Sequence, residues 1–133
     1  MRVLVDTSAY SAFMRGHPEL KLALQGAEEI YLSPIVLGEL QSGFRRGKHR
    51  ARNEKGLDQF LGAPRVELIP ILDSTAVRYA EILTYLRGAG NPIPTNDVWI
   101  AASAMEHGLR VLTTDKHFEE VPQILVDCWE PWS

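Results

Sequence analysis

The sequence contains one cysteine, Cys128, and no run of about 18 apolar residues. A single cysteine has no partner for a disulfide within the chain, which agrees with a reducing compartment. The lack of a long apolar run argues against a membrane-spanning helix, and the N-terminus lacks the basic start and long apolar core of a signal peptide. We therefore expect a soluble, cytoplasmic protein that does not bind a membrane.

Internal repeats, low-complexity segments and linkers rich in glycine or serine are also missing, so nothing in the sequence divides the chain. Hydrophobic residues make up 45% of its 133 residues, which is ample for one core. We therefore expect a single domain over residues 1–133.

Positive charge is scarce overall but concentrated in one segment. The formal net charge is −3, which argues against a general nucleic-acid binder. Residues 45–55 (RRGKHRARNEK), however, contain six Lys or Arg and one Glu. Such a segment can bind phosphates while the acidic remainder repels them, although many basic segments are simply solvated helix faces. Candidate substrate contacts here are Arg45, Arg46, Lys48 and Arg50.

Short apolar segments alternate with segments of helical periodicity along the chain. The expected strands cover residues 2–5, 30–33, 66–71, 110–114 and 123–127. The expected helices cover residues 8–15, 17–26, 33–44, 73–90 and 95–108, and a further helix closes at 56–62. This alternation indicates βαβ units, and the fold class expected is α/β: a three-layer sandwich with a central, mostly parallel sheet flanked by helices.

The clearest helical pattern covers residues 73–90. Asp73 or Ser74 is expected to cap its N-terminus, and Gly88 is expected to end it. Its apolar positions recur at helical spacing and are expected to face the core: Val77, Ala80, Leu83 and Leu86.

Four acidic residues occupy the positions that such a fold brings to one rim. Asp6 follows the first strand (VLVDTSAY) and Asp115 follows the fourth (VLTT). Glu39 lies on the first turns of the helix that Ser33 begins, and Asp97 lies in the first turn of the last helix. Because the carboxyl ends of parallel strands and the N-termini of the helices that follow lie on one rim, all four carboxylates are expected to converge.

Helix or turn capping is the alternative explanation for Asp6, Asp97 and Asp115, because an acid near a helix N-terminus accepts hydrogen bonds from free amides. Glu39 lies beyond the capping positions and has apolar neighbours, so its carboxylate is expected to be partly buried and to need a partner. The nearest basic residues in the sequence, Arg45 and Arg46, are more than one helical turn away.

Carboxylates that crowd together repel one another unless a cation lies among them. Mg²⁺ or Mn²⁺ fits best, since these ions prefer oxygen ligands. Zinc is less favoured, because the four histidines show no paired ligand spacing, and His117 is interpreted as a surface turn residue. The hydroxyls of Thr7, Ser8 and Thr113 can orient a metal-bound carboxylate, or serve as helix caps.

Three segments, in this order and spacing, resemble the PIN-domain ribonucleases, specifically the VapC-type toxins of bacterial and archaeal toxin–antitoxin pairs. They are VLVDTSAY, LSPIVLGEL and PTNDVWIAASAMEHGLRVLTTDKHFEEVP. The resemblance extends from residue 2 to about residue 127. It implies that the family's four acids are Asp6, Glu39, Asp97 and Asp115, with Glu119 as the alternative to Asp115, and that Ser8 and Thr113 match its small polar positions.

The resemblance also implies an activity. One or two Mg²⁺ ions would bind the acids, with Asp6 and Asp97 as the main ligands, and an activated water would cleave RNA to leave a 5′ phosphate and a 3′ hydroxyl. Glu39 and Asp115 would bind a second ion, or orient and deprotonate the water. The substrate would be a single-stranded loop of transfer or ribosomal RNA, and the partner an antitoxin protein. A homodimer is expected, with a heterotetramer or larger assembly as its complex with antitoxin.

Two other functions stay open. A DNA-directed nuclease of the same fold would use the same acids, and a binding module would keep the fold without the metal. A haloacid-dehalogenase-type phosphatase is disfavoured, because the second Asp that it needs is replaced by Ser8. Phosphate-binding GxxxxGK and GxGxxG patterns are absent from the sequence.

Overall fold

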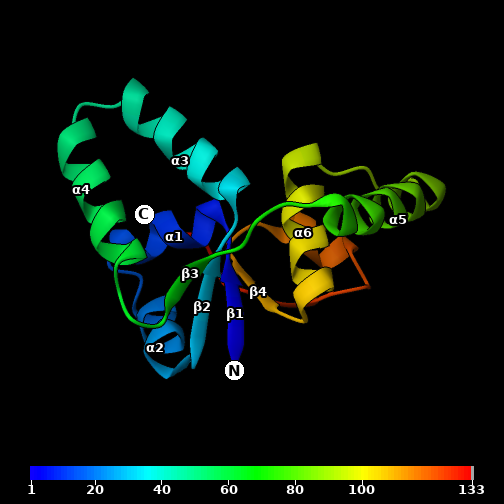
Figure 1. Cartoon of the computed structure of the whole chain (residues 1–133), viewed down its shortest axis with the longest axis horizontal. Coiled ribbons are helices and arrows are strands. Elements are labelled where there is room, and N and C mark those ends of the chain that lie inside the picture. The colour runs from blue at the N-terminus through cyan, green and yellow to red at the C-terminus, as the bar shows by residue number, and fades with distance from the viewer. Residues whose placement is uncertain (133) are drawn as a thin grey trace.

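A parallel five-stranded sheet forms the centre of the computed structural model, which describes residues 1–132 (Figure 1). Its strands lie in the order β3-β2-β1-β4-β5, and every neighbouring pair is parallel. The strands are β1 (Arg2–Val5), β2 (Glu29–Leu32), β3 (Val66–Leu68), β4 (Arg110–Thr113) and β5 (Leu125–Cys128). The predicted α/β class with a central parallel sheet is confirmed.

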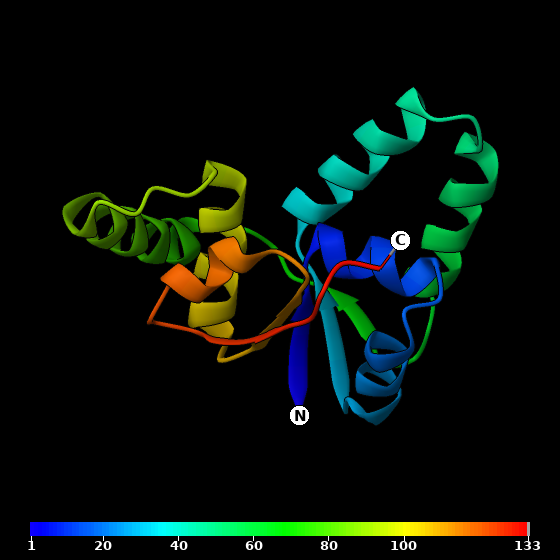
Figure 2. The same cartoon turned by 180° about the vertical axis from the view of Figure 1, so that it is seen from behind.

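Helices lie on both sides of the strands. In Figures 1 and 2, α1, α2, α3 and α4 lie on one side, whereas α5, α6 and the short 3-10 helix η1 lie on the other. Among residues 1–132, none of the helices is both long and apolar enough to cross a membrane. The bounds are α1 (Thr7–Met14), α2 (Pro18–Gly26), α3 (Pro34–Arg46), α4 (Arg50–Leu61), α5 (Asp73–Ala89), α6 (Thr95–His107) and η1 (Lys116–Glu120).

The central strand β1 is apolar at successive positions. Its residues 3–5 are completely buried, because a parallel strand with helices on both faces needs apolar side chains on both. The neighbouring β4 buries Val111 and Leu112 in the same way. The edge strands are more exposed, as Leu68 on β3 and Leu125 on β5 show. The most deeply buried part of the sheet is therefore the pair β1 and β4, which end side by side.

Polar residues directly after two strands begin the next helices. Asp6 is the N-cap of α1, and its carboxylate accepts a hydrogen bond of 2.8 Å from the Ala9 N–H. Ser33 is the N-cap of α3, and its hydroxyl oxygen accepts from the Ile35 N–H at 3.1 Å. Capping at both positions agrees with the sequence, since Asp and Ser are favoured N-cap residues.

The ends of α5 differ from the prediction. Its N-cap is Leu72, whose N–H donates to the Thr75 hydroxyl at 3.1 Å, so neither Asp73 nor Ser74 is the cap. Gly88 lies within the helix, whose last residue is Ala89 and whose C-cap is Gly90, where φ is +74°. A left-handed residue of this kind closes a helix, and glycine adopts that conformation without strain.

The buried face of α5 also differs from the prediction. Of the four predicted positions, Leu86 is buried and Leu83 packs partly buried against the core, whereas Val77 and Ala80 are exposed. The other buried residues of the helix are Thr75 and Ile82. The helix has apolar residues on more than one face, so periodicity alone did not identify the face that packs on α6. The predicted third strand is shorter than expected and ends at residue 68, shortly before a proline that has no N–H for the ladder.

Candidate active site

The carboxyl ends of β1 and β4 bring Asp6 and Thr113 together. The Thr113 hydroxyl donates to Asp6 Oδ2 at 2.6 Å, and the Ser8 hydroxyl lies 2.9 Å from Asp6 Oδ1 and 3.0 Å from Asp6 Oδ2. The Ala9 N–H supplies a third donor. These contacts hold the carboxylate of Asp6, a residue that is only 3% exposed.

Burial raises the pKa of Asp6 to about 6, although the hydrogen bonds from Thr113, Ala9 and Ser8 oppose this effect by stabilising the carboxylate. The negative charge of Asp97 raises the pKa further. Asp6 is thus a buried anion without a cationic partner among the groups that shift its pKa. A bound cation would relieve this cost.

Ser8 also connects the ends of the two strands. Its oxygen accepts a hydrogen bond of 3.0 Å from the Thr114 N–H and lies 3.2 Å from the Thr113 hydroxyl. The Asp115 N–H donates to the Thr113 hydroxyl oxygen at 2.8 Å. Ser8 and Thr113, both singled out from the sequence, therefore join Asp6 to the backbone that carries Asp115.

Glu39 projects from α3 and is held by two other helices. The Thr7 hydroxyl on α1 donates to Glu39 Oε1 at 2.6 Å, and Asn96 Nδ2 on α6 donates to Glu39 Oε2 at 3.2 Å. The partners that the sequence argument required for this carboxylate are therefore neutral donors. Asn96, which precedes Asp97, was not singled out from the sequence.

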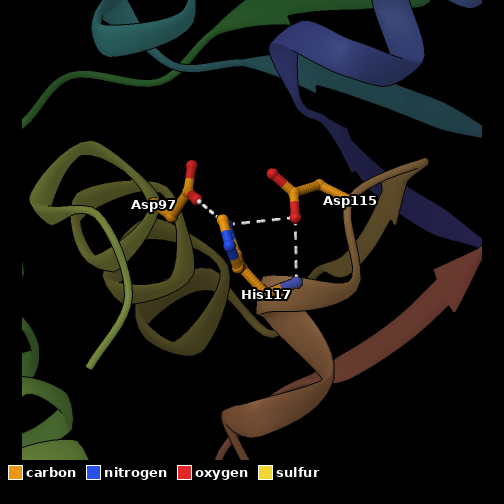
Figure 3. A group of neighbouring side chains, drawn as sticks. All are labelled: Asp97, Asp115 and His117. Carbon is orange, nitrogen blue, oxygen red and sulfur yellow. Dashed lines mark hydrogen bonds and ion pairs between the residues drawn. The ribbon is translucent and has the colours of Figure 1, made fainter. Parts of the chain in front are cut away.

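Asp97 and Asp115 face each other across His117, as Figure 3 shows. His117 Nδ1 lies 3.2 Å from Asp97 Oδ2 and 3.1 Å from Asp115 Oδ1. One potential ligand atom from each of these residues lies within 4.8 Å of the other two. The backbone N–H of His117 also donates to Asp115 Oδ1 at 2.9 Å, and this hydrogen bond caps the start of η1.

The pKa of Asp97 depends on the charges of the other acids. Burial raises the pKa of Asp97, the hydrogen bond with His117 lowers it, and the negative charges of Asp115 and Glu39 raise it again. Since Asp97 also raises the pKa of Asp6, all four predicted acids lie within electrostatic range of Asp97.

Two expectations for this rim can be compared with its geometry. Asp115 belongs to the group that can hold a metal ion, whereas Glu119 is exposed on η1 and is not part of that group. His117 is exposed and lies in the short helix η1, in agreement with its interpretation as a surface turn residue, and its ring also lies between two of the acids. The only signal in the sequence was the position of His117 directly before the apolar residue Phe118. In the structure, Phe118 is completely buried and anchors η1 against the fold.

An open cleft of about 500 Å³ leads away from the acids along α3. Glu39 and Asn96 line one part of it, and Ser42 and Arg46 line another. The Arg46 guanidinium donates to the Ser42 hydroxyl at 2.8 Å. This cleft therefore connects an acidic residue of the rim with one of the predicted basic substrate contacts.

The other predicted basic contacts lie around the turn between α3 and α4. Arg45 is in the last turn of α3, Lys48 is in the connection, and Arg50 begins α4. Arg50 forms an ion pair of 3.4 Å with Glu54, which partly neutralises its charge. Arg45 and Lys48 are exposed.

The chemistry of these donors fits a hard divalent cation. Four carboxylates and hydroxyl-bearing neighbours supply oxygen ligands, which Mg²⁺ and Mn²⁺ prefer. Burial and neighbouring negative charges raise the pKa of Asp6 and of Asp97, and a bound cation would oppose both effects. The residues at this rim therefore fit a magnesium or manganese site.

Comparison with known proteins agrees with this architecture. The PIN domain family model matches residues 3–124. Ribonuclease VapC2 of Rickettsia felis is 30% identical over 136 aligned residues, which cover 98% of this chain and 99% of the relative.

Solved structures give the same result for the fold. VapBC2 from Rickettsia felis, bound to a DNA fragment from its promoter, contains a chain with a TM-score of 0.84 and 29% identity, covering 98% of this chain and 100% of that one. VapBC-5 from Mycobacterium tuberculosis, a member of the VapBC family of toxin–antitoxin systems, gives a TM-score of 0.78 at 25% identity and covers 96% and 98% of the two chains. The predicted resemblance to VapC-type proteins is thereby confirmed, and the chain belongs to the PIN domain family.

Proposed function

We propose that this protein is a divalent-metal-dependent endoribonuclease and the toxin of a type II toxin–antitoxin pair. One observation carries the proposal: in a chain of the PIN domain family, the four acids Asp6, Glu39, Asp97 and Asp115 gather at the carboxyl rim of β1 and β4. The relative named ribonuclease VapC2 supports RNA as the substrate.

Each acid has a proposed role. Asp6 and Asp97 would be the main metal ligands, because Asp6 is buried, Asp97 is partly buried, and a cation would stabilise both anions. Glu39 and Asp115 would hold a second ion, or would orient and deprotonate the attacking water. A bound Mg²⁺ or Mn²⁺ would supply Lewis-acid stabilisation and would lower the pKa of a coordinated water.

The hydroxyls of Ser8 and Thr113 position Asp6 rather than react. Each donates to the Asp6 carboxylate, so its oxygens stay oriented while the substrate binds. Cleavage by water would leave a 5′ phosphate and a 3′ hydroxyl, with no covalent intermediate on any carboxylate.

The cleft along α3 is the proposed path of the RNA backbone. Arg46 lies in the cleft, and Arg45, Lys48 and Arg50 lie near its basic end. Lys and Arg side chains bind phosphates. A single-stranded loop of transfer or ribosomal RNA suits an open cleft, because its backbone and unstacked bases are accessible.

The proposed partner is an antitoxin protein, which the similarity to VapBC-5 supports. Its binding segment would cover the acidic rim and exclude the substrate. A homodimer, assembled with antitoxin into a heterotetramer or larger complex, and a cytoplasmic location complete the proposal.

Replacing Asp97 with Asn tests the proposed chemistry. The substitution removes one negative ligand at nearly constant volume, so Mn²⁺-dependent cleavage of an RNA hairpin should fall at least about a hundredfold. Cleavage is measured from the end-labelled products of matched RNA and DNA hairpins, with and without a chelator.

Asp58→Asn is the matched control, because Asp58 is an exposed carboxylate on α4 outside the rim. It should cleave RNA at the wild-type rate. Full activity of Asp97→Asn would overturn the assignment, and equal cleavage of the DNA hairpin would favour the DNA-directed alternative.

A further inference from the structure

We infer that His117 is a nitrogen ligand of the metal site and makes this site prefer Mn²⁺ and other transition ions over Mg²⁺. The inference rests on the proposed function, because it concerns the same rim of acids. The inference adds an imidazole ligand, whose preference among metal ions differs from that of the carboxylates.

The position of the His117 ring is the first observation. Nδ1 lies 3.1 Å from Asp115 Oδ1 and 3.2 Å from Asp97 Oδ2, so one nitrogen faces both carboxylates (Figure 3). Adjacent ligands of an octahedral ion with bonds of about 2.1 Å are about 3.0 Å apart, and opposite ligands are about 4.2 Å apart. The two distances from His117 Nδ1 are close to the adjacent spacing, and all three potential ligand atoms lie within 4.8 Å of one another.

The way in which His117 is held is the second observation. Its backbone N–H donates to Asp115 Oδ1, and the next residue, Phe118, is completely buried. The ring is therefore carried by an anchored turn, although its side chain is 49% exposed. That exposure leaves room for an ion and its waters to enter beside the ring.

The affinity of an imidazole nitrogen differs more between Mg²⁺ and transition ions than the affinity of a carboxylate does. Mg²⁺ strongly prefers oxygen ligands, whereas imidazole suits transition ions, whose affinities for mixed nitrogen and oxygen sites rise from Mn²⁺ towards Cu²⁺. A site with several carboxylates and one imidazole should therefore bind Mn²⁺ and Co²⁺ more tightly than Mg²⁺.

An alternative function for the same geometry is an internal counter-ion. A protonated His117 would pair with Asp97 and Asp115 at the same distances and would compete with a metal ion. The two functions have opposite consequences when the ring is removed: a ligand weakens the binding of transition ions, whereas a competitor strengthens the binding of every cation.

Electron spin-echo envelope modulation of bound Mn²⁺ tests the inference directly, because it detects a nitrogen nucleus bonded to the ion. The full chain should show this ¹⁴N coupling, and His117→Ala should lose it. In calorimetric titrations, His117→Ala should bind Mn²⁺ at least about tenfold more weakly while Mg²⁺ affinity changes less. His117→Asn, which offers an amide oxygen, should retain Mg²⁺ affinity and lose the preference for Mn²⁺.

The control is His107→Asn, since His107 pairs with Glu106 at the far end of α6. It should leave both the spectrum and the affinities unchanged. A spectrum without ¹⁴N coupling, or tighter binding of both ions by His117→Ala, would overturn the inference.

These outcomes are separable from those of the proposed function. Nitrogen coupling in a protein that does not cleave RNA would contradict the nuclease proposal and leave the ligand intact. Metal-dependent cleavage of RNA without nitrogen coupling would support the nuclease proposal and contradict the assignment of His117 as a metal ligand.

Discussion

Asp6 serves the fold and the proposed site with one carboxylate. It caps α1 through the Ala9 N–H, and it is held at the rim by Ser8 and Thr113. The capping explanation and the functional explanation for this residue are therefore compatible. Because the carboxylate is buried, the metal-free fold carries an electrostatic cost that a neutral side chain would avoid.

That cost predicts how the stability of the metal-free protein depends on pH. The pKa of Asp6 is about 6 in the fold and roughly 3.9 in an unfolded chain. The contribution of Asp6 to the free energy of unfolding is therefore largest below the lower pKa and is lost as the pH rises through 6. Asp6→Asn removes this loss and should stabilise the protein at pH 7.5 by about 1 to 3 kcal/mol. Urea unfolding in the presence of a chelator measures it.

The same comparison at pH 4.5 is the control, because much of the difference should disappear where Asp6 is protonated in the fold. A difference between Asp6→Asn and wild type that is independent of pH would contradict the role of ionisation. Addition of Mn²⁺ should reverse the order at pH 7.5, since only the wild type retains the charged ligand.

Individual residues of the site were predictable where they lie at the ends of elements. Asp6, Asp97 and Asp115 follow strands or begin helices, and the α/β pattern places such positions on one rim. His117 and Asn96 were missed, because their contacts are between elements. His117 meets Asp97 from a different part of the chain, and spacing within a helix or strand gives no signal for such a pair.

The helix α5 illustrates what can be read at the scale of elements. Its existence and length follow from the sequence, but its cap, its last residue and its buried face do not. Two glycines near its end, Gly88 and Gly90, have similar neighbours in the sequence. Only the fold determines which one closes the helix, through the positive φ of Gly90.

Alanine substitutions at these glycines should have opposite effects. Gly88 is helical, and an added Cβ would meet no atom within 4 Å, so Gly88→Ala should stabilise the protein by about 0.5 to 1 kcal/mol. Gly90→Ala should destabilise it by about 1 to 2 kcal/mol, because L-residues are strained at positive φ. Calorimetric melting of both variants checks the signs, and each variant serves as the control for the other.

Equal shifts of the two melting temperatures would contradict this account of the C-terminus of α5.

The strands were predicted more securely than the helix ends. Their short apolar runs are typical of a buried parallel sheet, and β3 was overestimated where Pro70 follows it.

At the scale of the whole molecule, charge is divided between the two ends of one cleft. Glu39 lies at the acidic rim, and Arg46 lies about two turns further along α3. An RNA chain in this cleft would place one phosphate at the metal and another at the basic end. The basic segment was evident from composition, but its position relative to the acids depends on how α3 packs beside α6.

Removal of Arg46 should weaken RNA binding without affecting the metal site. In the non-cleaving Asp97→Asn background, Arg46→Ala should lower RNA affinity and reduce the steepness of its dependence on salt by about 0.7, the contribution of one phosphate contact on single-stranded nucleic acid. Fluorescence anisotropy at several salt concentrations measures both effects.

Arg87→Ala is the matched control, because it removes the same charge from an exposed position near the end of α5. It should leave the salt dependence unchanged. If both variants weaken binding equally, the contribution is net charge rather than a contact in the cleft.

The hydrogen bond from Thr113 to Asp6 joins residues 107 positions apart in the chain, at the ends of the paired strands β4 and β1. During synthesis, a chain still attached to the ribosome would contain Asp6 before Asp97 and Asp115 had been added. The centre would be assembled only when almost all of the polypeptide has emerged, so translation itself would delay the appearance of a competent nuclease.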